Sequence, residues 1–299
     1  LFRDLELAKH GLQVVPYGGG VTFTSDGDIL GNYTDDDVQR REFARHNARD
    51  ADAYHRYSTD VTRQCKFIRP LLMRTPPDPT SFKPKDLMEL LWLGKRFHAM
   101  GEKRMYETIR FFTMSAADYL DEYFESDVIK GHLSGSSVIG TALGPRSPGS
   151  AYVLLHHYMG EVDGHAGSWG FARGGMGAIT QALAKSLQAS GGNYMVDAGV
   201  DEILVSGGRA RGVRLESGEE LLAPVVVSNL DVKRTFLKTI KEEHLPEDFV
   251  TRVRNFRIRG SSAKINMAFD GLPTWPSLPK DSPILKGDLH YSESLDEVE

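Results

Sequence analysis

Apolar and polar residues alternate in the first part of the chain, which is the spacing of β-strands. Within residues 10–33, Val21 and Phe23 alternate with threonines, and a run of three glycines precedes them. Asp26-Gly27 has the residue types of a tight hairpin turn. The pattern predicts several short strands in this segment.

The apolar spacing then changes to three and four residues, which is typical of helices. Residues 34–72 begin with Thr34 and three aspartates, a capped start that predicts one helix to about Leu72. Residues 73–84 carry four prolines and are expected to form a linker. Further helices are predicted over about 86–113, from Ser115 onward, and over about 127–140, followed by a loop at 144–149.

The last third of the chain turns back to strands. Gly174-Gly175-Met176-Gly177 is expected to open a helix that ends near Ala189. Two glycine-containing turns, Gly207-Gly208 and Ser217-Gly218, and two short helices after Asp231 are also predicted. Strands are expected at 193–197, 200–206, 210–216, 219–223, 225–228 and 263–269.

Helices followed by a cluster of strands favour an α/β or α+β architecture with a helical insertion. We expect residues 34–160 to form a mainly helical lobe that serves a substrate or a partner. Residues 1–33 and 161–299 are expected to form the α/β part. A chain of 299 residues, 40% of them hydrophobic, is long enough for a sizeable core.

Composition excludes several classes of function. A net charge of −5 argues against nucleic acid as a main partner, because a phosphate-binding face carries an excess of Lys and Arg. The single cysteine, Cys65, can form neither an internal disulfide nor a redox pair, and a half-buried packing role is expected for it. No apolar run approaches the ~18 residues of a membrane span. No His or carboxylate spacing predicts a metal site.

One long stretch carries a family resemblance. The sequence GGMGAITQALAKSLQASGGNYMVDAGVDEILVSGGRARGVRLESGEELLAPVVVSN (174–229) resembles the second half of the FAD-binding region of phytoene desaturases, retinol saturases and flavin amine oxidases. PGSAYVLLHHYMG (148–160), GSWGFARGGMG (167–177) and AKINMAF (263–269) are similar to the phytoene-dehydrogenase-like branch, which includes pyridine nucleotide-disulphide oxidoreductase domain-containing proteins. The resemblance implies an FAD cofactor and an α/β flavoprotein fold of the two-dinucleotide-binding type, with a mixed sheet and a helical insertion lobe.

The resemblance also implies which residues bind the cofactor. Val200 matches the valine whose main chain meets the adenine, and the glycine turn matches the boundary between cofactor and substrate. By themselves these residues fit a tight turn into a helix and an ordinary strand valine equally well. The implied cofactor-binding residues are Val200, Gly174, Gly175, Gly177, Ser228 and Asn229.

The sequence departs from the family at the phosphate-binding motif. No G-x-G-x-x-G run is followed by a helix, and the family's closing glycine-rich segment is missing as well. We therefore expect an internal fragment of such an enzyme, with an incomplete fold, that binds FAD weakly or not at all by itself. A lineage that has lost both ends is the alternative.

Three residues are candidates for catalysis. His156 and His157 lie on a short apolar segment, and histidine acts as an acid or base near neutral pH. Neighbouring histidines on a helix point about 100° apart, so only one of them can face a given pocket. Lys264 lies in a predicted strand. A packed or surface histidine pair and a solvent-facing lysine explain the same residues without catalysis.

The function implied by the resemblance is FAD-dependent removal of a hydride from a C–H or C–N bond of an apolar small molecule. A non-catalytic interaction or regulatory protein that keeps the flavoprotein fold is the alternative. A membrane-surface carotenoid or lipid enzyme is a third interpretation, with the basic segment 86–113 as the contact. Homo-oligomerisation is left open. The family implies a cytoplasmic location in a bacterium and the mitochondrial matrix in a eukaryote.

Overall fold

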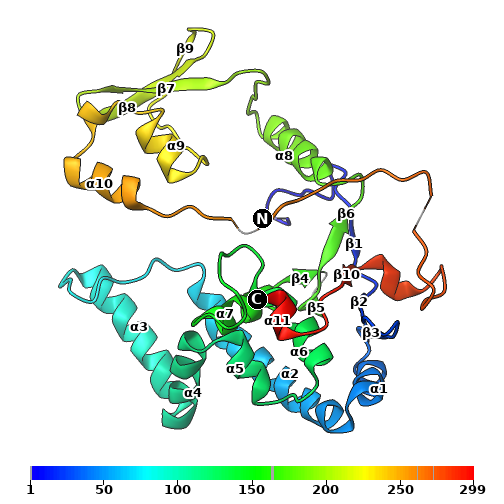
Figure 1. Ribbon diagram of the computed structural model, residues 1–299. Coiled ribbons are helices and arrows are strands. Elements are labelled where there is room, and N and C mark those ends of the chain that lie inside the picture. Colours follow the sequence, from blue (N-terminus) through cyan, green and yellow to red (C-terminus); the bar gives the residue numbers. More distant parts are fainter. Residues whose placement is uncertain (1, 163–164, 261, 272) are drawn as a thin grey trace. The chain divides into compact units, whose positions relative to one another are not determined.

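The computed structural model describes residues 2–162, 165–260, 262–271 and 273–299, and it contains two compact units (Figure 1). Unit 1 consists of Leu1–Leu12 and Gly177–Arg259, and unit 2 of Gln13–Met176 and Gly260–Glu299. Each unit is discontinuous in sequence. The division into a helical lobe (34–160) and an α/β part (1–33 and 161–299) was predicted on functional grounds, and it stays a prediction.

Unit 2 contains three small groups of strands. The predicted strands within residues 10–33 are confirmed, and so is the turn at Asp26-Gly27, where the Gly27 N–H donates to Thr24 O at 3.1 Å. β2 pairs antiparallel with β3 and parallel with β10, while β1 and β6 pair antiparallel. The strands of unit 2 are β1 (Val14–Pro16), β2 (Gly20–Phe23), β3 (Ile29–Asn32), β4 (Glu161–Val162), β5 (His165–Ala166), β6 (Gly170–Ala172) and β10 (Asp288–His290).

Helices make up most of the rest of unit 2. Ser115 and Ser126 cap α5 and α6, because each hydroxyl accepts a hydrogen bond from a backbone N–H of the first turn. The helices are α1 (Asp36–His46), α2 (Ala48–Ile68), α3 (Pro84–Met100), α4 (Glu102–Thr113), α5 (Ala116–Asp121), α6 (Asp127–Ser134), α7 (Ser150–His157) and α11 (Leu295–Val298), with the 3-10 turns η1 (Arg69–Leu71), η2 (Gly135–Ser137) and η4 (Pro283–Lys286).

The prediction of one helix over residues 34–72 is wrong, because Asn47 interrupts it. Asn47 is extended (φ −158°, ψ 117°), and its side chain accepts hydrogen bonds from the N–H groups of Arg49 and Asp50. An asparagine side chain satisfies the free N–H groups at a helix start, so it stabilises a new beginning. Gly101, with a positive φ of 79° that favours glycine, separates α3 from α4 within the predicted helix 86–113.

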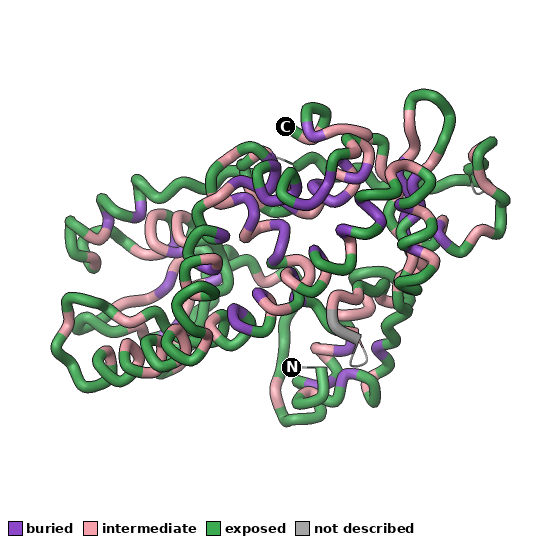
Figure 2. The backbone as a smooth tube through the Cα atoms, turned by 90° about the horizontal axis from the view of Figure 1, so that it is seen from below, coloured by how far each residue is buried: buried purple, intermediate pink, exposed green. Residues whose placement is uncertain are grey.

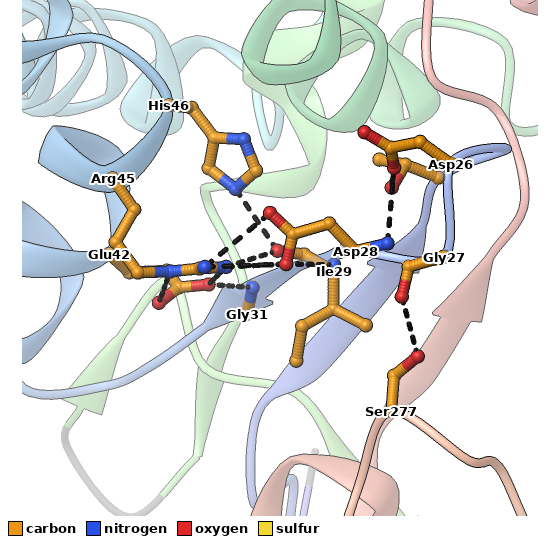
Figure 3. A network of polar contacts seen from close by, with 10 residues as sticks. Asp26, Gly27, Asp28, Ile29, Gly31, Glu42, Arg45, His46 and Ser277 are labelled. Carbon is orange, nitrogen blue, oxygen red and sulfur yellow. Dashed lines mark hydrogen bonds and ion pairs between the residues drawn. The ribbon is translucent and has the colours of Figure 1, made fainter.

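A polar network joins α1 to the β2–β3 hairpin (Figure 3). The Arg45 guanidinium donates to Ile29 O at 2.6 Å and to an Asp28 carboxylate oxygen at 3.1 Å. Its Nε donates to Glu42 at 3.1 Å, and Glu42 in turn accepts from the Gly31 N–H at 2.9 Å. The hydrogen bond to Glu42 raises the pKa of Arg45 above its usual value, so the network contains a permanent cation.

The core of unit 2 contains both aromatic and aliphatic side chains, and Figure 2 marks the buried residues along the backbone. The Tyr57 ring lies 5.5 Å from the ring of Tyr123 and 5.2 Å from that of Phe124, with the edge of one ring toward the face of the other. Such packing adds to the stabilisation from burial alone. Phe43, Phe111 and further apolar residues of α5, α6 and α7 are buried in the same cluster.

Unit 1 is an antiparallel meander with short helices (Figure 1). The predicted pairing is confirmed: the strands lie in the order β7-β8-β9, and Gly207 and Gly208, both with positive φ, form the two-residue turn. Ile203 and Leu215 are buried on one face of this meander. The elements are α8 (Gly177–Ala189), β7 (Val200–Ser206), β8 (Arg209–Leu215), β9 (Glu220–Leu222), α9 (Val232–Leu237), η3 (Glu242–His244) and α10 (Glu247–Asn255).

Three predicted strands, at 193–197, 225–228 and 263–269, are wrong. These segments are irregular, and most of their apolar residues are exposed, with Val227 89% exposed. A strand needs a neighbour for its N–H and C=O groups. Within the described part of the chain, none of the three segments pairs with another strand.

Candidate functional site

The glycine turn between β6 and α8 has the predicted form. Gly174 and Gly175 have φ values of 85° and 78°, which favour glycine, and the Gly175 N–H donates to Ala172 O at 2.9 Å. Gly177 then opens α8. A Cβ at Gly177 would have no neighbour within 4 Å, and its φ is not positive. The fold therefore does not require a glycine at position 177.

Val200 lies at the start of β7, the edge strand of the meander, and is 41% exposed. It is opposite Leu215, and the Glu216 N–H donates to Gly199 O at 2.8 Å. This bond makes Val200 and Leu215 a non-hydrogen-bonded pair, so the N–H and C=O groups of Val200 point away from β8. They face the free edge of the sheet, and among the described residues they have no partner there. Main-chain recognition of an adenine needs this geometry.

Ser228 and Asn229 do not close a strand, and this part of the prediction is wrong. The Ser228 hydroxyl lies 2.8 Å from that of Thr235 and accepts from the Leu230 N–H at 3.3 Å. These contacts order the chain just before Asp231, whose side chain caps α9. The contacts of Ser228 are those of a residue that stabilises a helix start. Asn229 is exposed.

His156 and His157 end α7 and point in different directions, with their ring planes 76° apart. His157 Nδ1 donates to Val153 O at 2.9 Å, which leaves its Nε2 as the free nitrogen. The His157 ring stacks on the Trp169 ring at 5.7 Å, and Trp169 Nε1 donates to His157 O at 3.3 Å. His156 lies 3.3 Å from the Tyr152 hydroxyl and is exposed.

Sequence reasoning missed an aromatic surface beside the glycine turn. Tyr17 stacks on Phe171 with ring centres 4.4 Å apart, and it lies 6.2 Å from Trp169. We call Tyr17, His157, Trp169 and Phe171 the aromatic shelf. Burial, followed by the charge of Asp288, raises the pKa of Tyr17, so its hydroxyl stays protonated near neutral pH. The spacing of Trp169 and Phe171, two residues apart where β6 begins, was the available signal.

The shelf brings two predicted site regions together within unit 2. Phe171 belongs to β6, and Gly174 and Gly175 follow that strand directly. His157 reaches the same strand pair through its stacking on Trp169. An imidazole and a flat aromatic surface therefore lie on this strand pair, and the glycine turn follows it directly.

Lys264 and Cys65 are the remaining two residues that the sequence singled out. Lys264 is exposed in an irregular segment, so its predicted place in a strand is wrong. Cys65 is half-buried as predicted, with Sγ 3.9 Å from Leu155 O, and burial raises the pKa of its thiol to about 11. A thiol with that pKa is a poor nucleophile near neutral pH.

Clustered metal ligands and membrane-spanning helices are both absent from the residues that the structure describes. No group of three or more His, Cys, Asp or Glu side chains there is arranged to hold a metal ion. No helix in the same described ranges has the length and apolar character needed to cross a bilayer.

Comparison with known proteins identifies the family. Residues 104–297, about two thirds of the chain, match the flavin containing amine oxidoreductase family. The chain is 35% identical to pyridine nucleotide-disulfide oxidoreductase domain-containing protein 2 of Mus musculus, over 94% of this chain and 51% of that protein. It is 41% identical to a phytoene desaturase (neurosporene-forming) of Cereibacter sphaeroides over 31% of this chain and 17% of that protein. A prolycopene isomerase of Daucus carota is 38% identical over 32% of this chain and 15% of that protein.

The chain belongs to the flavin containing amine oxidoreductase family. Membership implies an α/β flavoprotein fold and a flavin cofactor, and the structure has the expected helices and mixed parallel and antiparallel pairing. The chain spans about half the length of the mouse and rat relatives that it matches over nearly its whole length.

Proposed function

We propose that the protein carrying this sequence is an FAD-dependent oxidoreductase that removes a hydride from a C–H or C–N bond of an apolar small molecule. The observation that supports this most is the family match over residues 104–297. Two relatives are named for phytoene and prolycopene, which favours an apolar substrate. Bound FAD would supply the hydride acceptor.

Two features of unit 1 fit contacts with FAD. The peptide groups of Val200 are free at a sheet edge, and they can read an adenine without help from a side chain. Gly177 opens α8 although the local fold accepts a larger residue there. A glycine in a helix lowers stability by about 0.5–1 kcal/mol relative to alanine. Close approach of a ligand to the backbone would explain why a glycine is present at this position.

Unit 2 would contribute the surface for the substrate. The aromatic shelf offers exposed ring faces, with Trp169 41% and Phe171 48% exposed, on which an apolar molecule can lie. His157 is part of the shelf, and its Nε2 can form a hydrogen bond with a polar group of the substrate. In this proposal the shelf orients the substrate, while His156, Lys264 and Ser228 have no direct role.

The cofactor is tested on the protein expressed from its complete coding sequence. We expect a yellow protein with flavin absorbance bands, which releases FAD, identified by mass, when it is denatured. A colourless, folded protein that does not take up added FAD would contradict the proposal. It would favour the alternative of a non-catalytic interaction protein that has kept the fold.

The role of Val200 is tested by two substitutions in the same protein. Val200→Ala keeps the peptide groups and should change FAD affinity less than about threefold. Val200→Pro removes the N–H donor and should weaken binding by roughly tenfold or more, the cost of a lost buried hydrogen bond. Flavin fluorescence on dilution measures both. If two folded variants retain FAD equally, Val200 serves only packing.

A further inference from the structure

A groove lies where the C-terminal half of α2 meets the corner between α3 and α4. Its volume is about 330 Å³, and side chains from all three helices line it. This volume is near the lower limit for small-molecule sites, which range from about 300 to 1,000 Å³. All three helices belong to unit 2, so the groove is formed within one compact unit.

The groove has an excess of positive charge. Four cations line it and no carboxylate does. Arg63 is paired with Asp60 and lies 3.7 Å from Glu107, whereas Lys66, Arg96 and Arg104 form no ion pair with any described carboxylate. Three unpaired cations around one groove are unexpected in a chain with a net charge of −5. The charge pattern therefore favours an anionic ligand.

Arg96 is held rigidly in the wall of the groove. Its Nη2 donates to Phe67 O at 3.0 Å, and its guanidinium lies 5.3 Å from the Phe67 ring and 5.0 Å from the Trp92 ring. Its Nε is buried and has no hydrogen-bond partner among the described residues. A fixed, incompletely compensated guanidinium is a strong binding element for carboxylate or phosphate.

The groove is also apolar over much of its wall. Phe67 and Met100 line it, and the Thr108 hydroxyl below them is already satisfied by Gln64 at 3.1 Å. On α3, Met88 and Trp92 precede Arg96 at intervals of four residues, which places them along one side of that helix. A strip formed by the exposed Met88 and by Trp92, whose ring has the Arg74 guanidinium 4.0 Å from its centre, therefore leads away from the cationic site.

We propose that this groove binds the anionic head of an amphiphile, a carboxylate or phosphate joined to a long apolar chain. Arg96, Lys66 and Arg104 hold the head. Phe67 and Met100 contact the first part of the chain, and the strip on α3 receives the remainder. None of these residues has a part in the proposed flavin chemistry, so the inference stands on its own observations.

Binding of cis-parinaric acid, a fluorescent long-chain fatty acid, tests the proposal. The double variant Lys66→Glu/Arg104→Glu should weaken binding by at least about tenfold, since hydrogen bonds to charged groups contribute most to such sites. The control is the double variant Lys95→Glu/Lys103→Glu, which changes the net charge by the same amount. Lys95 lies on α3 and Lys103 on α4, and neither residue lines the groove. This control should stay within about twofold of the unchanged protein.

Competitors identify the part of the ligand that is recognised. Oleate should displace the probe, whereas oleyl alcohol, which lacks the charge, and inorganic phosphate, which lacks the chain, should not. Displacement by phosphate as effective as by oleate would overturn the proposal of an amphiphile. An equal loss of affinity in both double variants would show that the groove is not the binding site.

Vesicles distinguish the two sources of such a ligand. Capture by phosphatidylglycerol vesicles but not by phosphatidylcholine vesicles, lost in Lys66→Glu/Arg104→Glu, would show that the head belongs to a membrane lipid. Displacement by oleate without capture would show a free fatty acid. If the double variant does not fold, the single variant Arg104→Gln replaces it and should also weaken binding of cis-parinaric acid, by a smaller factor. An unchanged affinity in a folded Arg104→Gln variant would contradict the proposal.

Discussion

The helices α2 and α3 have comparable lengths and amphipathic patterns, yet they have different surroundings. α2 buries eight of its residues, including Tyr57 and Phe67. α3 has no fully buried residue, and Leu87, Met88 and Leu91 are exposed on it. The comparison shows that helical spacing of apolar residues predicts the helix itself, whereas burial depends on what the rest of the unit places beside it.

The largest expected effect is on the buried face of α2. Tyr57→Ala removes a ring that is 2% exposed and should lower the free energy of unfolding of unit 2 by about 3–5 kcal/mol. Urea unfolding followed by tryptophan fluorescence measures it, because Trp92, Trp169 and Trp275 all lie in unit 2.

The matched change on α3 is Leu91→Ala. It should alter the same unfolding free energy by no more than about 0.5 kcal/mol, because this side chain is 60% exposed. A loss comparable to that of Tyr57→Ala would show that α3 is covered in solution and would contradict the contrast between the two helices.

The next effect depends on pH and on His132 of α6, whose Nδ1 lies 2.8 Å from the Thr22 hydroxyl. Burial, with the charge of His290 acting in the same direction, lowers the pKa of His132 to about 3. As the pH falls, His132 is therefore protonated in the unfolded chain before it is protonated in the folded protein. Above about pH 6.5 the residue is neutral in both states and does not affect the free energy of unfolding through its charge. Stability should fall as the pH drops from 6.5 toward 3, by roughly 2 kcal/mol at pH 5.

His132→Gln should flatten this pH dependence of the unfolding free energy. His98→Gln, on the exposed side of α3, is the control and should leave the slope unchanged. An unchanged slope in folded His132→Gln would assign the acid sensitivity of unit 2 to other groups.

An effect smaller than those of Tyr57→Ala and of the pH change concerns how the two helices begin. Asn47 caps α2 with its side chain, whereas Lys83 precedes α3 without such a bond. Asn47→Ala should lower the stability of unit 2 by about 1 kcal/mol, and Lys83→Asp should raise it by up to about 1 kcal/mol. Thermal unfolding of both variants checks the pair. A stabilising Asn47→Ala would mean that a continuous helix is preferred there.

Local chemistry made much of the fold predictable. The turns at Asp26-Gly27 and Gly207-Gly208, the cap at Ser115 and the glycine start of α8 all depend on neighbouring residues alone. The break at Asn47 was missed because an asparagine is tolerated inside a helix, and its capping geometry is visible only in three dimensions.

Strand pairing and side-chain contacts between residues far apart in the sequence could not be predicted from the local pattern. The valine run 225–227 has strong strand propensity, but the propensity of a segment does not supply a neighbouring strand. For the candidate site, sequence indicated the glycine turn and the histidine pair. Tyr17 escaped notice because its stacking on Phe171 joins residues that are far apart in the chain.

The pairing of β10 with β2 has a consequence for how the protein is made. β2 (Gly20–Phe23) leaves the ribosome well before β10 (Asp288–His290), because more than 260 residues separate the two strands in the sequence. At about 5–20 residues per second, the two strands are synthesised on the order of tens of seconds apart. Meanwhile the β2–β3 hairpin has an open edge, with Val21 not yet enclosed, although unit 1 can already fold. The nascent chain therefore passes through a prolonged stage in which an aggregation-prone edge is uncovered, and a chaperone would be of most use during that interval.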